Sequence, residues 1–315
     1  MIFKVNLVTL KWVLEIKWVL EIKVSFLNNL IIEIVMKHTL LITIVLALLF
    51  LASHVVGLVI IDKYLPKELP TGEVVERELP LNIERPEVKE ETSYIPIFIT
   101  ILFATLLAFL LIKFQLFKLW KLWFFLSIAL TLTIAFSAFI NQTYAIPLAI
   151  ILALIKLFKP STIFNNFVEV FIYGGLAAIF VPLFNLTSIF ILLILISIYD
   201  AYAVYKSKHM IKLAKFQSKE KIFTGLSIPY EAKFKGKKKV FATAILGGGD
   251  IGFTLFFSGV ILKEFNLLSA LITSFVITLF LIILLFYGKK GKFYPAMPIL
   301  TLGCFIGYLI IRFVI

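Results

Sequence analysis

Residues 186–205 read LTSIFILLILISIYDAYAVY, a run of twenty residues in which Asp200 is the only charged side chain. A helix of this length is long enough to cross the hydrocarbon core of a bilayer, which is roughly 30 Å thick. Similar runs recur along the chain, since 61% of its 315 residues are hydrophobic and the mean hydropathy is +1.06. Soluble domains contain about 45–50% apolar residues. The sequence therefore predicts a polytopic membrane protein.

Run length and flanking charge predict an all-α fold with nine membrane-spanning helices. Two long hydrophilic segments separate them, residues 62–94 with nine acidic side chains and residues 206–239 with eleven lysines. The helices are expected at residues 39–61, 95–112, 118–140, 142–158, 166–184, 186–205, 240–262, 266–287 and 295–315.

Lysine and arginine are distributed unevenly between the two sides that these spans define. If the N-terminus is cytoplasmic, 24 of the 31 basic residues fall in cytoplasmic segments. Positively charged loops stay in the cytoplasm, so the N-terminus is predicted inside and the C-terminus outside. Residues 62–94 are then an external loop and residues 206–239 a cytoplasmic loop, whose charge suits anionic lipid headgroups. A lysine run directly before a span is a topology anchor, so nucleic acid is not an expected partner.

The first 35 residues differ from the rest, because KWVLEI at residues 11–16 is repeated without change at residues 17–22. One interpretation is an extension upstream of a true start at Met36. The other is an amphipathic helix lying on the membrane surface. Residues 36–315 are expected to form one membrane domain.

Two aspartates, Asp200 and Asp250, are the acidic residues that lie well inside predicted spans. An ionisable group in hydrocarbon is costly and indicates function. Both lie toward the cytoplasmic ends of their spans, with no basic residue at mid-span to neutralise them. Two such carboxylates would share a proton, as in an aspartyl protease or in the proton relay of a transporter. Charge placement alone does not separate these two functions.

Other chemistries lack their residues. Cys304 is the only cysteine and is interpreted as a packing residue, and the three histidines are scattered. A disulfide, a zinc site or a serine-histidine protease therefore has no support, and we expect no metal, nucleotide or organic cofactor.

Three short motifs follow one another on three spans. They are Tyr199-Asp200, then Gly247-Gly248-Gly249-Asp250, then Pro295-Ala296-Met297. In this order they resemble the Tyr-Asp, Gly-x-Gly-Asp and Pro-Ala-Leu motifs of the presenilin and signal peptide peptidase family of intramembrane aspartyl proteases. The stretch YDAYAVYKSKHM at residues 199–210 looks most like the archaeal presenilin homologues. Prepilin peptidases share only the Gly-x-Gly-Asp element. The resemblance covers residues 36–315 and departs from the family at Met297.

The resemblance implies a nine-span protease of the cell membrane that hydrolyses peptide bonds within transmembrane segments. It makes Asp200 and Asp250 the catalytic pair, and it assigns the other motif residues to the active site and to substrate binding (Tyr199, Gly247, Gly248, Gly249, Pro295, Ala296 and Met297). The presenilin-like orientation implies single-span substrates whose N-terminus is outside. Nothing in the sequence requires accessory subunits, and a homo-oligomer remains open.

Smaller features give further expectations. Residues 234–245 mix lysines with β-branched and aromatic residues, so part of this stretch is expected to pair with an extended substrate by strand addition; proline at Val240 or Phe241 should then reduce cleavage. Glu169 is expected to reach interfacial water. Gly174-Gly175 is interpreted as helix packing, and Asn141 and Asn185 as helix caps.

Overall fold

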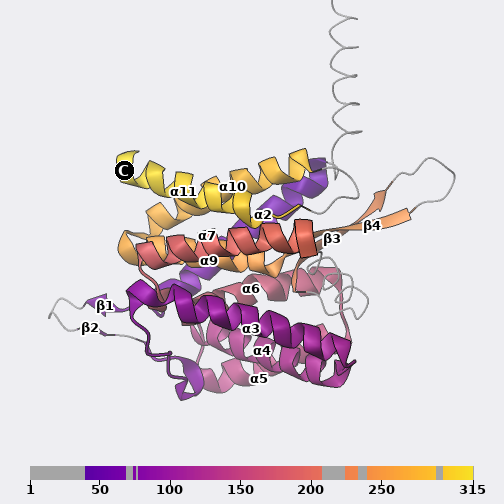
Figure 1. Ribbon diagram of the computed structural model, residues 1–315. Coiled ribbons are helices and arrows are strands. Elements are labelled where there is room, and N and C mark those ends of the chain that lie inside the picture. Colours follow the sequence, from indigo (N-terminus) through magenta and orange to yellow (C-terminus); the bar gives the residue numbers. More distant parts are fainter. Residues whose placement is uncertain are drawn as a thin grey trace, which may run out of the picture.

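The computed structural model describes residues 40–68, 74–75, 77–207, 224–232, 240–288 and 294–314 (Figure 1). The predicted extension at residues 1–35 lies outside these residues. Within them, nine α-helices of at least 17 residues form the body of the molecule. They are α2 (Leu40–Asp62), α3 (Tyr94–Lys113), α4 (Phe117–Ser137), α5 (Gln142–Phe158), α6 (Thr162–Phe180), α7 (Leu186–Tyr202), α9 (Gly248–Glu264), α10 (Leu267–Tyr287) and α11 (Met297–Val314).

The helices are apolar on the outside of the bundle as well as in its core. Six helical segments have the length and hydropathy to cross a membrane, while α5 and α11 are shorter apolar helices. Leu41, Phe158 and Ile163 are 70%, 72% and 85% exposed, which would be unfavourable in water but suits contact with lipid. The chain is therefore a multi-pass membrane protein.

Small residues allow the central helices to approach closely. A methyl group added at Gly174 would lie 2.5 Å from Ile60 of α2, and one added at Gly175 would lie 1.9 Å from the carbonyl oxygen of Thr131 of α4. At Gly175 the neighbour is backbone, which cannot move aside, so this position requires glycine, whereas a side chain at Gly174 would force the tip of Ile60 to shift. The prediction of helix packing at Gly174-Gly175 is confirmed. Cys304 is a buried member of the apolar core, as expected.

Helix starts follow the sequence. The side chain of Asn141 accepts a hydrogen bond from Thr143 N at the start of α5. Asn185 and Ser188 form a capping box at the start of α7, each side chain accepting from the other's backbone N–H. Asn141 and Asn185 are confirmed as helix caps.

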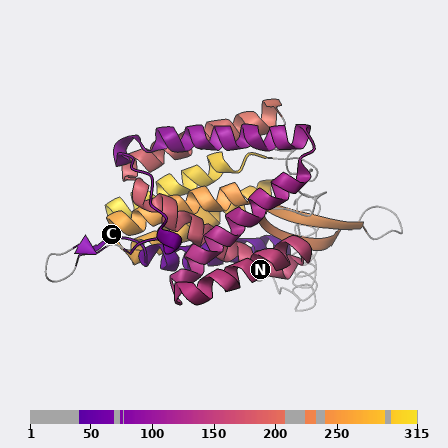
Figure 2. The same ribbon diagram turned by 90° about the horizontal axis from the view of Figure 1, so that it is seen from below.

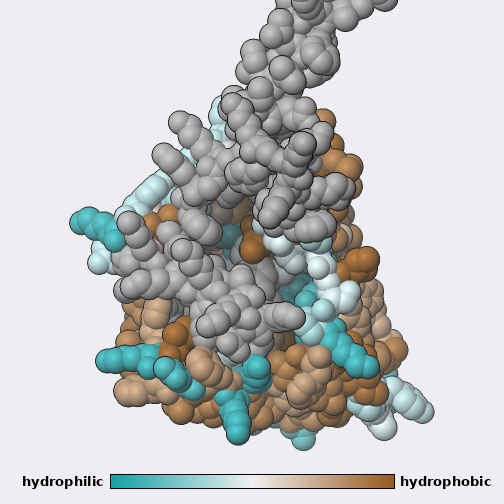
Figure 3. Space-filling model, turned by 90° about the vertical axis from the view of Figure 1, so that its right-hand side faces the viewer, coloured by the Kyte–Doolittle hydropathy of each residue, from teal (hydrophilic) through white to brown (hydrophobic). Residues whose placement is uncertain are grey.

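The fold is not entirely helical. A short hairpin joins β1 (Lys67–Glu68) to β2 (Val74–Val75), and a longer one joins β3 (Gly225–Ala232) to β4 (Val240–Gly247), both antiparallel. Figures 1 and 2 show the hairpins extending beyond opposite ends of the helices. Viewed from the β3–β4 end, the described surface carries separate groups of hydrophilic side chains among hydrophobic ones (Figure 3).

The strand β4 corrects one predicted boundary. A span was expected over residues 240–262, whereas α9 begins only at Gly248. Residues 240–247 instead pair with β3, because the β-branched and apolar residues there favour a strand and Gly247 begins the helix as its N-cap. Residues 240–245 are the described part of the stretch 234–245, and the pairing of this stretch with a substrate stays a prediction.

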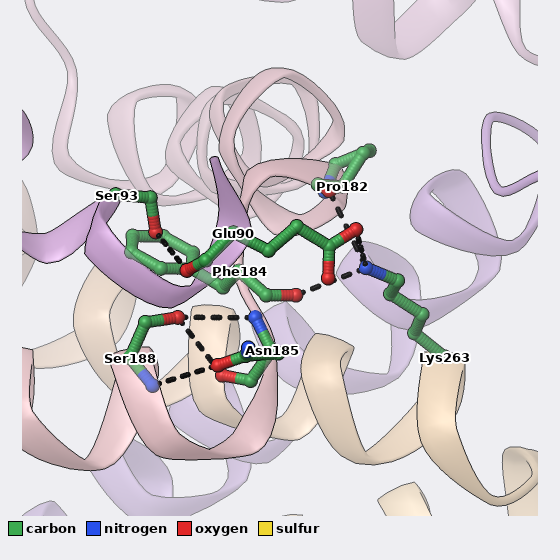
Figure 4. Close-up of polar contacts among 7 residues, drawn as sticks. All are labelled: Glu90, Ser93, Pro182, Phe184, Asn185, Ser188 and Lys263. Carbon is green, nitrogen blue, oxygen red and sulfur yellow. Dashed lines mark hydrogen bonds and ion pairs between the residues drawn. The ribbon is translucent and has the colours of Figure 1, made fainter. Parts of the chain in front are cut away.

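A polar network ties together the β1–β2 end (Figure 4). Lys263, in the last turn of α9, donates to Glu90 Oε1 at 2.8 Å and to the carbonyl oxygen of Phe184 at 3.0 Å. Glu90 lies just before α3, and Phe184 lies in the turn between α6 and α7. The side chain of Lys263 thus links α9 to the two segments that lead into α3 and α7.

Candidate active site

Asp200 lies close to the C-terminal end of α7 and is 9% exposed. Its Oδ2 accepts a hydrogen bond from the backbone N–H of Met297 at 3.1 Å, across 97 residues of sequence. The backbone N–H of Ala296 also faces this carboxylate. Directly after α7 the chain makes a π-helical turn, Ala203–Ser207, a rare geometry that is frequent at functional sites.

Asp250 is the third residue of α9. Its carboxylate accepts a hydrogen bond from the backbone N–H of the N-cap residue Gly247. A methyl group added at Gly247 would lie 3.1 Å from Oδ2 of Asp250. The first N–H groups of a helix lack internal partners, and the helix dipole favours negative charge there. The Gly-Gly-Gly-Asp sequence therefore places the carboxylate at the N-terminus of α9.

The two aspartates converge. They come from neighbouring helices, α7 and α9, and lie close enough to interact electrostatically. The segment Pro295–Met297, buried at the start of α11, meets Asp200 through its backbone. The structure thus brings together all three sequence motifs, with Tyr199 half-buried beside them.

The glycines before Asp250 have different neighbours. A methyl group at Gly249 would meet only Phe253, at an ordinary 3.7 Å, whereas one at Gly248 would lie 2.9 Å from Tyr173 Oη of α6. The backbone of Thr224 is farther, at 3.5 Å. The side chain of Tyr173 therefore lies closer than the backbone of Thr224 to the space that a side chain at position 248 would need.

An apolar cavity of about 320 Å³ opens next to this turn, between α3, α4, α6 and α9. Aromatic and aliphatic side chains such as Phe124, Ile128 and Phe253 line most of it. Its polar lining comes from Ser127 and Thr131 of α4, from Glu169 and Tyr173 of α6, and from Thr224 with the backbone of Gly248 and Gly249.

Glu169 corrects a second expectation. It is 1% exposed and forms an ion pair of 2.7 Å with Lys156, itself buried, so it does not reach interfacial water. Its other oxygen accepts from Tyr173 Oη at 2.5 Å. The ion pair joins α5 to α6, and the hydrogen bond lies within α6. One signal for this cluster is present in the sequence: Asn166, Glu169 and Tyr173 are spaced i, i+3 and i+7 on one helix face.

The fold and the paired carboxylates define a class, a multi-pass membrane protein with two acidic groups meeting between helices. The sequence model for the family described as signal-peptide peptidase, presenilin aspartyl protease matches residues 78–315. The chain therefore belongs to the presenilin and signal peptide peptidase family of intramembrane aspartyl proteases.

Solved structures show the same fold. A presenilin family intramembrane aspartate protease in space group C222 superposes with a TM-score of 0.58 at 18% identity, covering 85% of this chain and 97% of the other. A presenilin family intramembrane aspartate protease in space group P2 gives a TM-score of 0.59 at 16% identity, with 86% and 97% covered. No curated protein matches the chain in sequence. Membership of a protease family decides against the transporter alternative.

Proposed function

We propose that Asp200 and Asp250 are the catalytic pair of this protease and hydrolyse a peptide bond within the membrane. The observation that carries the proposal is the meeting of the two buried or half-buried carboxylates of α7 and α9 beside an apolar cavity. Like charges at such a site cannot both ionise readily, so the pair shares a proton.

The shared proton gives the two carboxyl groups different tasks. The ionised carboxylate takes a proton from a water molecule, which attacks the carbonyl carbon of the scissile bond. The protonated carboxyl donates to the carbonyl oxygen and so stabilises the negative charge that develops there. When the tetrahedral intermediate collapses, the first carboxyl gives the leaving amine the proton that it took from water, the second carboxyl recovers its proton from the diol, and the C–N bond breaks.

The remaining motif residues are proposed to orient this pair and the substrate. Backbone N–H groups of Ala296 and Met297 hold one carboxylate, and that of Gly247 holds the other. Pro295 precedes this segment, Tyr199 precedes Asp200 on α7, and Gly248 and Gly249 line the cavity through which a substrate would approach Asp250. Substrates are proposed to be single-span proteins whose helix enters the cavity between α3, α4, α6 and α9.

Before cleavage the substrate must unwind, because a helix keeps its carbonyl groups in hydrogen bonds. We propose that the unwound part pairs with the outer edge of β4. The outer edge of β3 is occupied: Asn166 of α6 donates to Ser227 O at 2.8 Å and accepts from Ser227 N at 3.0 Å. Pro229, two residues on, has no N–H to offer at this edge. Strand addition is therefore favoured on β4.

The orientation proposed is an N-terminus in the cytoplasm, nine spans and a C-terminus outside. The uneven distribution of basic residues supports it. So does the bundle itself, in which the β1–β2 hairpin and the C-terminus lie at one end and the β3–β4 hairpin at the other.

The test is cleavage of a single-span substrate by the purified protein in lipid vesicles. Asp200→Asn and Asp250→Asn keep the size of the side chain and remove the ionisable group, so each should abolish cleavage. Asp62→Asn, at the end of α2, serves as a control and should cleave like the wild type. Cleavage by either of the first two variants at the wild-type rate would refute the assignment.

A further inference from the structure

One face of α6 carries three buried polar side chains, Asn166, Glu169 and Tyr173, which are 7%, 1% and 4% exposed. Their spacing of three and four residues aligns them along the helix toward the β3–β4 hairpin and the start of α9. Asn166 binds the backbone of Ser227 on β3, as described above. The same face continues toward the turn that carries Asp250.

The centre of this face is anchored by charge. Lys156, in the last turn of α5, donates to Glu169 Oε1 at 2.7 Å, and Tyr173 donates to Oε2 at 2.5 Å. A buried ion pair has a large desolvation cost, which good geometry and further hydrogen bonds offset. Here both oxygens of Glu169 have a donor. The phenol of Tyr173 is consequently held in one direction.

The phenol of Tyr173 packs against Gly248, in the turn before Asp250. Tyr173 Oη would lie 2.9 Å and Cε1 3.3 Å from a methyl group added at Gly248. On another side of the turn, the N–H of Gly248 donates to the carbonyl oxygen of Thr224 at 3.2 Å. Gly248 is thus enclosed by a fixed side chain and a backbone bond, two residues before Asp250.

We propose that Lys156, Glu169 and Tyr173 form a positioning relay that holds the turn Gly247–Asp250 and thereby sets where the Asp250 carboxylate meets Asp200. The relay also accounts for glycine at position 248, since the space of a side chain is taken by the phenol. This inference rests on the proposed catalytic pair, and none of the three residues is assigned a chemical step.

The test is a double-mutant cycle between Gly248→Ala and Tyr173→Phe, with kcat and KM measured on a single-span substrate in vesicles. Displacing a reacting group by about 1 Å can cost on the order of a hundredfold in rate, so Gly248→Ala should lower kcat by at least about tenfold with a smaller effect on KM. Tyr173→Phe should lower kcat by only a few-fold. The double variant should recover much of the loss, because phenylalanine lacks the oxygen that clashes.

Matched controls separate this contact from general damage. Gly249→Ala makes the same change one residue later, away from Tyr173, so Tyr173→Phe should not relieve any loss that it causes. Tyr64→Phe removes another buried phenolic hydrogen bond, to Ile134 O at 2.7 Å near the β1–β2 end, and should leave kcat unchanged. If Gly248→Ala does not fold, Tyr173→Phe should restore its folding for the same steric reason.

The outcomes distinguish this inference from the proposed function. A double variant whose kcat loss equals the product of the two single losses would overturn the relay. Wild-type activity of Gly248→Ala would also overturn it. So would an unfolded Gly248→Ala variant whose folding Tyr173→Phe does not restore. If Asp200→Asn and Asp250→Asn abolish cleavage in the same assay, the catalytic pair survives that result. If they do not, the pair itself is wrong.

Discussion

At the scale of single residues, the carboxylate of Asp200 is held by backbone donors. The N–H of Met297 reaches Oδ2 at 3.1 Å, and the residue begins α11. The side chain of Met297 is buried and apolar, so its identity matters through volume. Leucine, found in the family motif, should therefore serve equally well.

This gives a residue-scale prediction. Met297→Pro removes the N–H that binds Asp200, while proline is tolerated at the first position of a helix. A hydrogen bond to a charged group contributes about 1.5–3 kcal/mol, so kcat should fall by roughly tenfold or more. Met297→Leu keeps the N–H and should retain most of the activity, since Leu and Met exchange at small cost. Equal activity of the two variants would show that the N–H is dispensable.

At the scale of elements, the β3–β4 hairpin has a definite register. Ser227 turns its backbone groups outward to Asn166, so its partner Ile245 on β4 also points its own groups away from the ladder. Because hydrogen-bonded and non-hydrogen-bonded pairs alternate along the strand, the backbone N–H and C=O groups of Thr243 and Phe241 also point outward. Those of Val240 point toward β3. Of the two proline positions expected from the sequence, only Phe241 therefore tests strand addition without breaking the hairpin.

The element-scale prediction uses Thr243, which is exposed. Thr243→Pro removes one outward N–H from the edge of β4 and leaves the ladder to β3 intact. If an extended substrate pairs with this edge, cleavage should fall several-fold, mainly through KM. Thr243→Ala keeps the N–H and is the matched control. Thermal unfolding of both variants should match the wild type, and unchanged cleavage by Thr243→Pro would exclude pairing at that position.

At the scale of the whole molecule, the two ends of the bundle differ in what they hold. At the β1–β2 end, the ion pair of Lys263 and Glu90 joins α9 to the segment before α3 (Figure 4). The two aspartates lie at the other end, near the last turn of α7 and in the first turn of α9, where the β3–β4 hairpin extends (Figure 1). The proposed orientation puts the aspartates on the cytoplasmic half of the membrane. Water would then enter the site from the cytoplasm.

Orientation is tested by labelling single cysteines in intact cells. In a Cys304→Ser background, Glu84→Cys and Lys159→Cys put an exposed thiol at the β1–β2 end and at the opposite end of the bundle. A maleimide that does not cross membranes should label Glu84→Cys directly. It should label Lys159→Cys only after the membrane is permeabilised. The reverse pattern would invert the proposed topology.

The sequence by itself determined the membrane class, the approximate helices and the two aspartates. Apolar runs of about 20 residues leave few alternatives to a spanning helix, and a carboxylate in such a run is conspicuous because burial is costly. The motif order then identified the family. These are local properties of the chain, and they survive without knowledge of packing.

Only the tertiary structure decided how distant segments meet. Residues 240–247 are apolar enough for a span, yet pairing with β3 makes them a strand. Glu169 looked like a residue near water until Lys156, thirteen residues earlier on another helix, was found to neutralise it. Nothing in the sequence indicated that Tyr173 lies against Gly248. Such contacts depend on the close approach of α5, α6 and α9, because a buried charge or a missing Cβ is explained by its neighbours in space.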